Sequence, residues 1–187
     1  MQTDEQLVKK ITEGDIELYA DIVERYQAKL VRYSAMLLNG NQAGAQDSVQ
    51  ETFIKAYVNL RSFKTDKKFS SWIYRICHNE SMNYIKKHKR EVQHDDEEWA
   101  GKLVDERPTQ DQEIEEMFAD KSTKQLLSKI DLKYREPLVM YIYYGKSYKE
   151  IADILKIPAA TVGVRINRAK AKLRQEIGTD KQQEGNK

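Results

Sequence analysis

Apolar residues recur every three or four positions along most of the chain, which is the spacing of α-helices with one buried face. In the N-terminal part this spacing predicts a short helix around Leu7 and Ile11, then three longer helices over 15–38, 45–61 and 69–87. Asp15 has the position and chemistry of an N-cap for the first long helix. The last of these helices is expected to bury the residues on one side of it, Phe69, Ile73, Ile76, Cys77 and Tyr84. Residues 1–90 are therefore predicted to form one all-helical domain.

Helical spacing fades over 91–122, where acidic residues cluster, and we predict a flexible acidic linker in which helix resumes only around 114–118. The acidic residues are either solvated or lie over a basic groove of the protein or of a partner. A second helical domain is expected over 123–177, followed by a polar tail over 178–187. Four helices are predicted for it: one around Leu127 and Ile130, one over 135–144 with Pro137 in its first turn, and a pair that follows.

That last pair has the pattern of a helix-turn-helix with a basic second helix. Ser147 and Glu150 form a capping box that starts the first helix, and Pro158 separates it from the second, which begins near Ala159. The second helix has one apolar stripe, made of Val162, Ile166, Ala169 and Leu173. Its outer side has short, polar and basic side chains that suit the edges of bases and phosphates: Ala160, Thr161, Val164, Arg165, Asn167, Arg168, Lys170 and Lys172. We interpret it as a DNA-binding helix, and a merely solvated basic face is the alternative.

A second polar strip runs along the helix at 69–87. Its members, Arg75, Asn79, Asn83 and Lys86, fall within about a quarter turn, and Arg90 continues the same direction. Trp72 borders this strip, and Phe63 and Lys64 begin a short loop just upstream that could hold one flipped nucleotide. Flat rings, amides and basic groups together suit unpaired bases, so the strip indicates binding of single-stranded nucleic acid. An ordinary solvated face is the alternative here too.

The helix at 45–61 has a polar cluster beside an apolar seam. Asp47, Gln50 and Glu51 share one face, next to Val49 and Phe53. This arrangement fits either a solvated helix or a surface on which another helix docks, and both interpretations remain open on the residues alone.

Composition limits the classes of protein that need to be considered. The 187 residues are 33% charged and 40% hydrophobic, which suits two small helical domains, and Lys and Arg exceed Asp and Glu only by 32 to 30. A single cysteine excludes an intrachain disulfide. We expect no cofactor, no metal and no catalytic site, because the three histidines have no partners at metal-ligand spacing and there is no phosphate-binding loop. The sequence has no apolar run near 18 residues and no export signal, so we expect a soluble cytoplasmic protein without membrane insertion.

Three motifs in order, at 47–57 (DSVQETFIKAY), 69–79 (FSSWIYRICHN) and 147–152 (SYKEIA), resemble the extracytoplasmic function group of bacterial sigma-70 factors. The resemblance implies a sigma region 2 domain at 1–90 and a region 4 domain at 123–177. It also implies a transcription initiation subunit, not an enzyme, that serves a stress or envelope response. The partners it implies are core RNA polymerase, through the clamp helices of the largest subunit and the flap of the second largest, promoter DNA, and an anti-sigma factor.

The resemblance also gives roles to matching residues. It implies that Asp47, Gln50, Glu51 and Phe53 dock on core polymerase. It implies that the minus-ten element is opened and bound by Phe63, Lys64, Trp72, Arg75, Asn79, Asn83, Lys86 and Arg90, and that the outer side of the helix from Ala159 reads the minus-thirty-five duplex. The chain departs from the family where Gly163 and Val164 replace a basic and a small hydroxylic residue, and where Gln46 replaces an acid. The competing hypothesis is a helix-turn-helix regulator that acts without polymerase.

Overall fold

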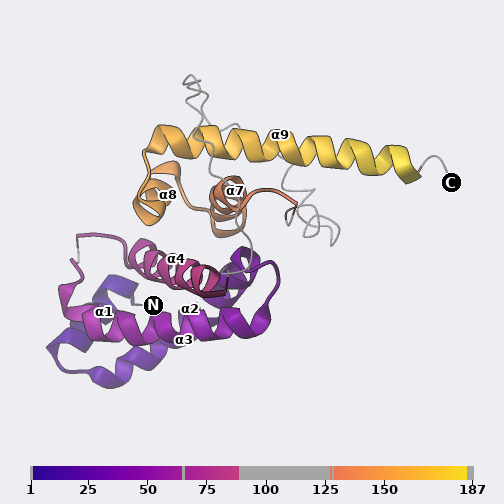
Figure 1. Cartoon of the computed structure of the whole chain (residues 1–187). Helices are drawn as coiled ribbons and strands as arrows, with labels where there is room; N and C mark the ends of the chain where they lie inside the picture. The colour runs from indigo at the N-terminus through magenta and orange to yellow at the C-terminus, as the bar shows by residue number, and fades with distance from the viewer. Residues whose placement is uncertain (1, 65, 89–126, 128, 185–187) are drawn as a thin grey trace. The chain divides into compact units, whose positions relative to one another are not determined.

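The computed structural model describes residues 2–64, 66–88, 127 and 129–184, with side chains as far as residue 175. These residues form two compact units, one from the N-terminal and one from the C-terminal part of the chain (Figure 1). All regular structure within the described ranges is α-helix or 3-10 helix, which confirms the predicted all-α fold class. The expected acidic linker, the helix at 114–118 and Arg90 lie outside the described residues.

The first unit contains the helices that the apolar spacing predicts, with shifted ends. Its described elements are α1 (Asp4–Glu13), the 3-10 turn η1 (Ile16–Leu18), α2 (Tyr19–Leu37), α3 (Gln42–Asn59), the 3-10 turn η2 (Leu60–Ser62) and α4 (Phe69–His88). Helices α2, α3 and α4 pack on one another, and α1 closes one end of this bundle (Figure 1). The core therefore lies between helices that also expose long outer faces.

Large apolar and aromatic side chains fill the core of the first unit. Ile22, Leu30 and Tyr33 of α2 are fully buried, as the spacing predicts, and so are Phe69, Ile73 and Cys77 of α4. On α4, Ile76 and Tyr84 are only half-buried, and Tyr74 and Ser81 take their places in the core. The buried hydroxyls of Ser34 and Ser81 lie 2.8 Å apart and form a hydrogen bond between α2 and α4, which satisfies both groups away from water.

The start of α2 differs from the sequence-based expectation. Asp15 does not cap it, because η1 intervenes and α2 begins only at Tyr19. Asp15 precedes η1, and its side chain makes no capping hydrogen bond there. The spacing of apolar residues does not distinguish a 3-10 turn from the first turn of an α-helix, since both place residues three apart on one side.

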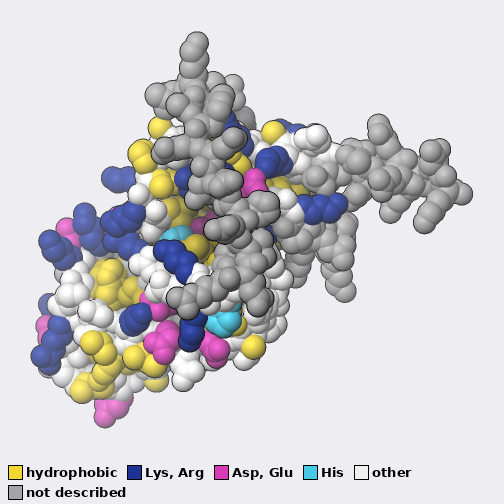
Figure 2. Space-filling view, in the orientation of Figure 1, with side chains coloured by type: hydrophobic (Ala, Val, Ile, Leu, Met, Phe, Trp, Pro, Cys, Tyr) yellow, Lys and Arg dark blue, Asp and Glu magenta, His cyan; other side chains and the backbone are white. Residues whose placement is uncertain are grey.

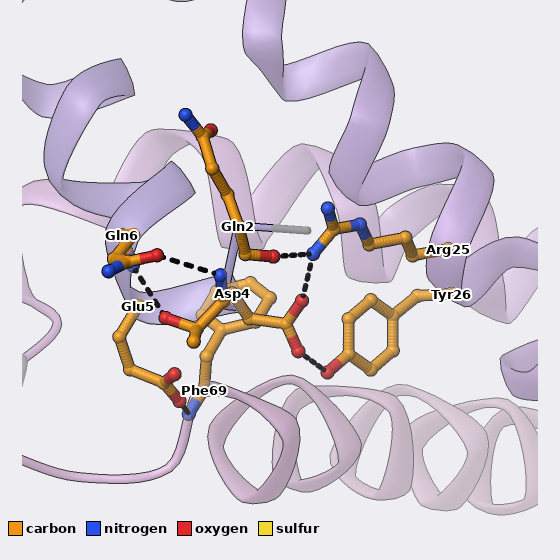
Figure 3. A network of polar contacts seen from close by, with 8 residues as sticks. Gln2, Asp4, Glu5, Gln6, Arg25, Tyr26 and Phe69 are labelled. Carbon is orange, nitrogen blue, oxygen red and sulfur yellow. Dashed lines mark hydrogen bonds and ion pairs between the residues drawn. The ribbon is translucent and has the colours of Figure 1, made fainter.

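A polar network joins α1 to α2 and α4 (Figure 3). The Asp4 carboxylate accepts hydrogen bonds from Arg25, at 2.9 Å, and from the hydroxyl of Tyr26. Glu5 accepts the backbone N–H of Phe69 at 2.9 Å, which places a negative charge at the N-terminus of α4, where the helix dipole favours it. Burial, and then the Asp4 carboxylate, raise the pKa of Tyr26 well above its usual range, so the phenol remains a donor. Helix α1 thus fixes the point at which α4 begins.

Gly44 lets α3 and α4 approach closely. A Cβ atom at this position would lie 2.5 Å from Cζ of Tyr84, a distance that a real Cβ does not reach. Tyr84 also accepts a hydrogen bond from Asn41, the N-cap of α3, at 3.3 Å. The ring of Tyr84 can therefore lie across the start of α3 only because residue 44 has no side chain.

The second unit contains α7 (Leu132–Tyr144), α8 (Tyr148–Leu155) and α9 (Ala159–Glu184). The predicted capping box is present, because the Ser147 side chain accepts from Glu150 N and the Glu150 side chain accepts from Ser147 N. Lys156 ends α8 with φ 56° and ψ 42°, a left-handed turn that redirects the chain toward α9. The apolar stripe of the second helix is fully buried, and it consists of Val162, Ile166, Ala169 and Leu173. The helix-turn-helix is therefore confirmed, and α9 continues past the expected domain end at 177.

Helix α7 begins three residues before the predicted start, so Pro137 lies inside it and not in its first turn. The described part of the helix predicted before α7 is limited to its end, where Leu127 and Ile130 are buried. The buried guanidinium of Arg135 donates to the Leu127 carbonyl at 3.2 Å. This contact fixes the segment before α7 against α7 itself.

Candidate nucleic-acid and protein interfaces

The face of α3 that the sequence singled out points away from the core. Asp47, Gln50 and Glu51 are exposed, while Ser48, Val49 and Thr52 on the other side of the helix are buried. Phe53 is half-buried, and its backbone carbonyl accepts the Tyr19 hydroxyl at 2.6 Å. Three of the four candidate docking residues are thus open to a partner, and the Phe53 side chain borders them from the seam.

Apolar residues continue this face along α3. Ile54 is 50% exposed, Tyr57 44% and Val58 73%, and Ile16 of η1 is 56% exposed. The Tyr57 ring meets the Tyr19 ring edge-on at 5.0 Å, and Tyr19 directly follows η1. We call Ile16, Ile54, Tyr57 and Val58 the apolar patch; Figure 2 shows hydrophobic side chains open to solvent on the first unit.

Sequence reasoning missed the apolar patch, although its signal was present. Ile54 and Val58 follow Gln50 and Glu51 at helical spacing, so they lie on the same side of α3. The predicted docking surface stopped at Phe53 and so left out Ile54 and Val58, which lie further along the same side of α3. An exposed apolar cluster beside polar residues is typical of a protein interface.

An ion pair joins α3 to α4 beside these surfaces. The ammonium of Lys55 lies 2.6 Å from the carboxylate of Glu80, whose side chain is only 11% exposed. Lys55 comes one turn after Glu51, and Glu80 directly follows Asn79. The pair therefore connects the helix with the docking candidates to the helix with the minus-ten candidates.

The strip on α4 is partly as predicted. Asn79, Asn83 and Lys86 are exposed, and Arg75 is half-buried. Both asparagines thus present their amides to solvent from a helix whose other side is anchored in the core. Amide groups on a rigid helix can read the Watson-Crick edges of unpaired bases.

Phe63 is a correction to the predicted surface, because its ring lies in the core and not among the exposed residues of the strip. The ring is only 8% exposed and packs edge-on against Phe69 at 5.5 Å. Half-buried Trp72 completes the cluster, with its ring 5.4 Å from Phe63 and 5.5 Å from Phe69. Burial of so large an apolar ring is favourable, and this explains why the Phe63 side chain packs into the core. Lys64, which follows it, is exposed.

Helix α9 presents its candidates with different degrees of exposure. Ala160, Asn167 and Lys172 are exposed, and Thr161, Val164, Arg165 and Arg168 are half-buried. Lys170 is a correction, because it is only 7% exposed and its ammonium lies 5.8 Å from the centre of the Tyr141 ring. Its long aliphatic chain packs toward α7, so it is not part of the outer side of α9.

Two basic residues of α9 converge on Tyr134 near the start of α7. The Arg168 guanidinium lies 5.9 Å from the ring centre and donates to the Tyr134 hydroxyl at 3.3 Å. The Lys172 ammonium lies 5.1 Å from the same ring and 2.7 Å from the Asp131 carboxylate. This hydrogen bond from Lys172 holds the pKa of Asp131 below its usual range.

The described residues offer little for other chemistry. They contain no group of three or more His, Cys, Asp or Glu side chains that could hold a metal ion. No helix among them is long and apolar enough to cross a membrane.

Comparisons with known proteins match two stretches of the chain to family models. Residues 22–91 match the family model for sigma-70 region 2, and residues 121–173 match that for sigma-70 region 4. The ECF RNA polymerase sigma factor SigW of Bacillus subtilis is 34% identical over 178 residues, which cover 91% of this chain and 94% of SigW. The chain belongs to the extracytoplasmic function group of sigma-70 factors. Members of this family are transcription initiation factors and not classical enzymes.

Other relatives support the same assignment for this sigma factor. The RNA polymerase sigma-H factor of Pseudomonas aeruginosa is 31% identical over 176 residues, covering 90% of this chain and 91% of the relative. The solved structure of CnrH in complex with the cytosolic domain of CnrY has a TM-score of 0.70 to this chain at 24% identity. It covers 96% of this chain and 99% of CnrH, so the two proteins share a fold.

In this sigma factor the unusual Gly163 has a packing role. A Cβ at this position would lie 3.3 Å from Cε2 of the Tyr148 ring on α8, which is tighter than most contacts of this kind. The Tyr148 ring in turn meets the Tyr141 ring of α7 edge-on at 5.5 Å. The departure from the family pattern thus leaves room for Tyr148 against α9.

Proposed function

We propose that this sigma factor recruits core RNA polymerase through α3, captures unpaired minus-ten bases on α4 and reads the minus-thirty-five duplex with α9. The observation that carries the proposal is the exposed face of α3, joined by the Lys55–Glu80 ion pair to the exposed asparagines of α4. A helix-turn-helix regulator acting alone has no need for these two surfaces in its other domain. Membership of the sigma family also argues against that alternative.

For the docking step, we propose that the polar and apolar halves of the α3 face act together. Asp47, Gln50 and Glu51 supply hydrogen-bond and charge partners, and the apolar patch supplies area that a partner can remove from water. This division is that of an interface with a hydrophobic centre and a polar rim. The partner proposed is the clamp helices of the largest polymerase subunit, since a coiled pair of helices offers a complementary ridge.

For the opening step, we propose that bases leave the duplex and bind the strip on α4. Extruding a base costs a few kcal/mol of stacking and pairing, which binding on the protein has to offset. Asn79 and Asn83 hydrogen-bond to base edges, exposed Lys86 follows them on α4 as a phosphate partner, and exposed Lys64 offers a second one in the loop before α4. The cluster of Phe63, Phe69 and Trp72 supports the loop from below, so Phe63 acts through its packing.

For duplex recognition, we propose that α9 enters the major groove with its outer side. Ala160, Thr161 and Val164 allow close approach, and Arg165, Asn167 and Arg168 supply the polar contacts to bases. Lys172 is placed for a phosphate, whereas buried Lys170 is left out of the contact set. Region 4 is also proposed to meet the flap of the second largest subunit, as the family resemblance implies.

An anti-sigma factor is the remaining proposed partner. The CnrH structure is a complex with the cytosolic domain of CnrY, and another protein of this fold, RpoE from Bartonella quintana, was solved with the anti-sigma factor NepR. The apolar patch is a surface that such an inhibitor has to cover in order to block polymerase binding. Isolation of the chain from its native cell should recover an inhibitory protein that competes with core polymerase.

The decisive experiment adds the purified chain to core polymerase on a promoter that core alone does not use. We expect a transcript with a unique start, and only weak binding to the same duplex without polymerase. A regulator acting alone would bind the duplex without polymerase and give no transcript with core. Glu24→Lys, at an exposed residue of α2 that belongs to none of the proposed surfaces, is the control and should leave initiation unchanged.

A further inference from the structure

Two residues at the start of α7 lie outside the helix-turn-helix yet hold side chains of its second helix. Tyr134 contacts Arg168 both through its hydroxyl, at 3.3 Å, and through its ring, at 5.9 Å. Asp131 contacts Lys172 at 2.7 Å, and the Lys172 ammonium also lies over the Tyr134 ring at 5.1 Å. Side chains from α7 thus meet two successive turns of α9.

The contacts with Tyr134 restrict the Arg168 side chain. An arginine has several rotatable bonds, and a partner that fixes it in advance lowers the entropy lost when it binds a base. The hydrogen bond to the Tyr134 hydroxyl and the closeness of the Tyr134 ring together limit where the Arg168 guanidinium can lie. Tyr134 is itself half-buried, so it is a firm support.

The acid at 131 is the more unexpected member of this group. A carboxylate on a surface that meets DNA repels phosphates, so electrostatics alone disfavours it there. Asp131 is the N-cap residue of α7, but its side chain makes no capping hydrogen bond and is directed to Lys172 instead. Its geometry therefore serves the orientation of Lys172 and not the start of the helix.

We propose that Asp131 and Tyr134 are positioning residues for promoter recognition: they hold Lys172 and Arg168 in the orientation in which these meet the minus-thirty-five duplex. This inference rests on the proposed role of α9. It assigns part of the recognition surface to α7, whose residues make no base contact of their own. The recognition helix is thus preorganised by its neighbour.

The sharpest test uses Asp131→Asn, because the two explanations predict opposite signs. Asparagine is as good an N-cap as aspartate, so the helix start is preserved. If Asp131 positions Lys172 for a phosphate, the change should weaken holoenzyme binding to both a native and a scrambled minus-thirty-five element by roughly two- to tenfold and lower its salt dependence. If the acid only repels DNA, its removal should raise affinity for both elements, and that result would overturn the proposal. Asp131→Glu, which keeps the carboxylate, should retain most of the affinity.

Tyr134→Phe provides an independent arm, since it removes the hydroxyl bonded to Arg168 and keeps the ring. We expect a partial loss of discrimination, and a larger loss with Tyr134→Leu, which removes both contacts. The assays use holoenzyme reconstituted with the full chain, and the salt dependence of promoter binding is measured for each variant. Loss of a phosphate contact lowers that dependence, whereas misplacement of Arg168 lowers discrimination at constant salt slope.

Arg168→Ala separates failure of this inference from failure of the proposed function. If Arg168→Ala leaves use of the upstream element unchanged, the proposed duplex surface itself is wrong. If Arg168→Ala reduces it while Asp131→Asn and Tyr134→Phe do not, the duplex surface stands and the positioning role is overturned. Thermal unfolding of each variant must match that of the parent chain, and Tyr134→Phe is the variant that preserves packing best.

Discussion

The two units present their candidate binding residues in different ways. In the first unit, Asp47, Gln50 and Asn79 are exposed on helices whose opposite sides are fixed in the core. In the second unit, Arg168 contacts Tyr134 of α7, and Lys172 contacts Asp131, the residue that precedes α7. A polypeptide or a single strand can change its conformation to fit an exposed surface. A DNA duplex has a fixed spacing of bases and phosphates, so it is bound more tightly by side chains that are already oriented. The first unit therefore relies on a rigid backbone under its exposed side chains, and the second unit also restricts the side chains themselves.

The largest effect that would sharpen this comparison is expected from Val58→Asp. Val58 is 73% exposed, so a charge there does not disturb the core, but it would have to be buried when polymerase docks. We expect binding to core polymerase to weaken by about 2 kcal/mol, or roughly thirtyfold, measured by competition with a labelled parent chain. Ala28→Asp, at an exposed site on α2, is the matched control. Equal affinity of Val58→Asp and the control would remove the apolar patch from the docking surface.

Asn79→Ala is expected to have the next largest effect. It removes an amide proposed to bind an unpaired base and should lower open-complex formation by about 1–3 kcal/mol. Binding to core polymerase should not change, because Asn79 lies on α4 and not on the docking face of α3. Permanganate reactivity of unpaired thymines on the promoter measures the opening, and Gln27→Ala, an exposed amide on α2, is the control. Loss of core binding together with opening would contradict the division of labour within the first unit.

Arg168→Ala tests the second unit in the same way. It should cost about 1–3 kcal/mol at a promoter that depends on the minus-thirty-five element, since one bidentate base contact has this value. Opening of a promoter whose minus-ten element is already unpaired should be unaffected. Footprints over the upstream element, with Arg32→Ala as an exposed arginine control on α2, measure the difference. A uniform loss on both promoters would break the separation of the two units.

A smaller effect is expected from the ion pair between α3 and α4. Lys55→Ala and Glu80→Ala should each lower stability slightly, and their double-mutant cycle should give a coupling of about 0.2–1 kcal/mol, because the Lys55 side chain is 47% exposed. Denaturant unfolding measures it at low and at high salt. The charge-exchanged pair, with Lys55→Glu and Glu80→Lys together, should recover part of the coupling. A coupling of zero at low salt would show that the two surfaces are joined by packing alone.

The smallest expected effect is a shift in titration at Asp131. Because Lys172 lowers the pKa of this carboxyl from its ordinary value of 3.8, the contact stabilises the folded unit above the unfolded pKa and is lost as pH falls through the folded pKa. The side-chain carboxyl carbon should therefore titrate below 3.8 in the parent chain and return toward it in Lys172→Gln. Nuclear magnetic resonance can follow this carbon directly. An unchanged midpoint in the variant would show that the 2.7 Å contact does not persist in solution.

Sequence reasoning located the helices and the exposed residues better than it located the buried exceptions. The spacing of Val162, Ile166 and Leu173 predicted a buried stripe, because burial of one helix face follows from periodicity. Phe63 and Lys170 were placed on binding surfaces and are instead packed against Phe69 and Tyr141. Whether a loop ring turns inward, or a lysine chain folds along a neighbouring helix, depends on tertiary contacts that spacing does not contain.

The same limit explains why positioning residues escaped notice in the sequence. Tyr134 and Asp131 are more than 30 residues before Arg168 and Lys172 in the chain, and only the packing of α7 on α9 brings them together. Sequence motifs identify residues that contact a ligand. They do not identify the residues that orient those contact residues. Gly163 is a similar case, since the ring that a Cβ there would crowd belongs to Tyr148 on α8.

The hydrogen bond between Glu5 and the N–H of Phe69 also bears on how the chain is made. Its partners are 64 residues apart in the chain. During synthesis on the ribosome, Glu5 of α1 can therefore form this hydrogen bond only after the start of α4 has emerged. Once α4 is complete, every partner in the network of Asp4, Glu5, Arg25 and Tyr26 is available. The first unit can then close while the residues of α7 to α9 are still untranslated. A nascent sigma factor would therefore hold the proposed polymerase-docking surface before it has the helix proposed to read the upstream duplex.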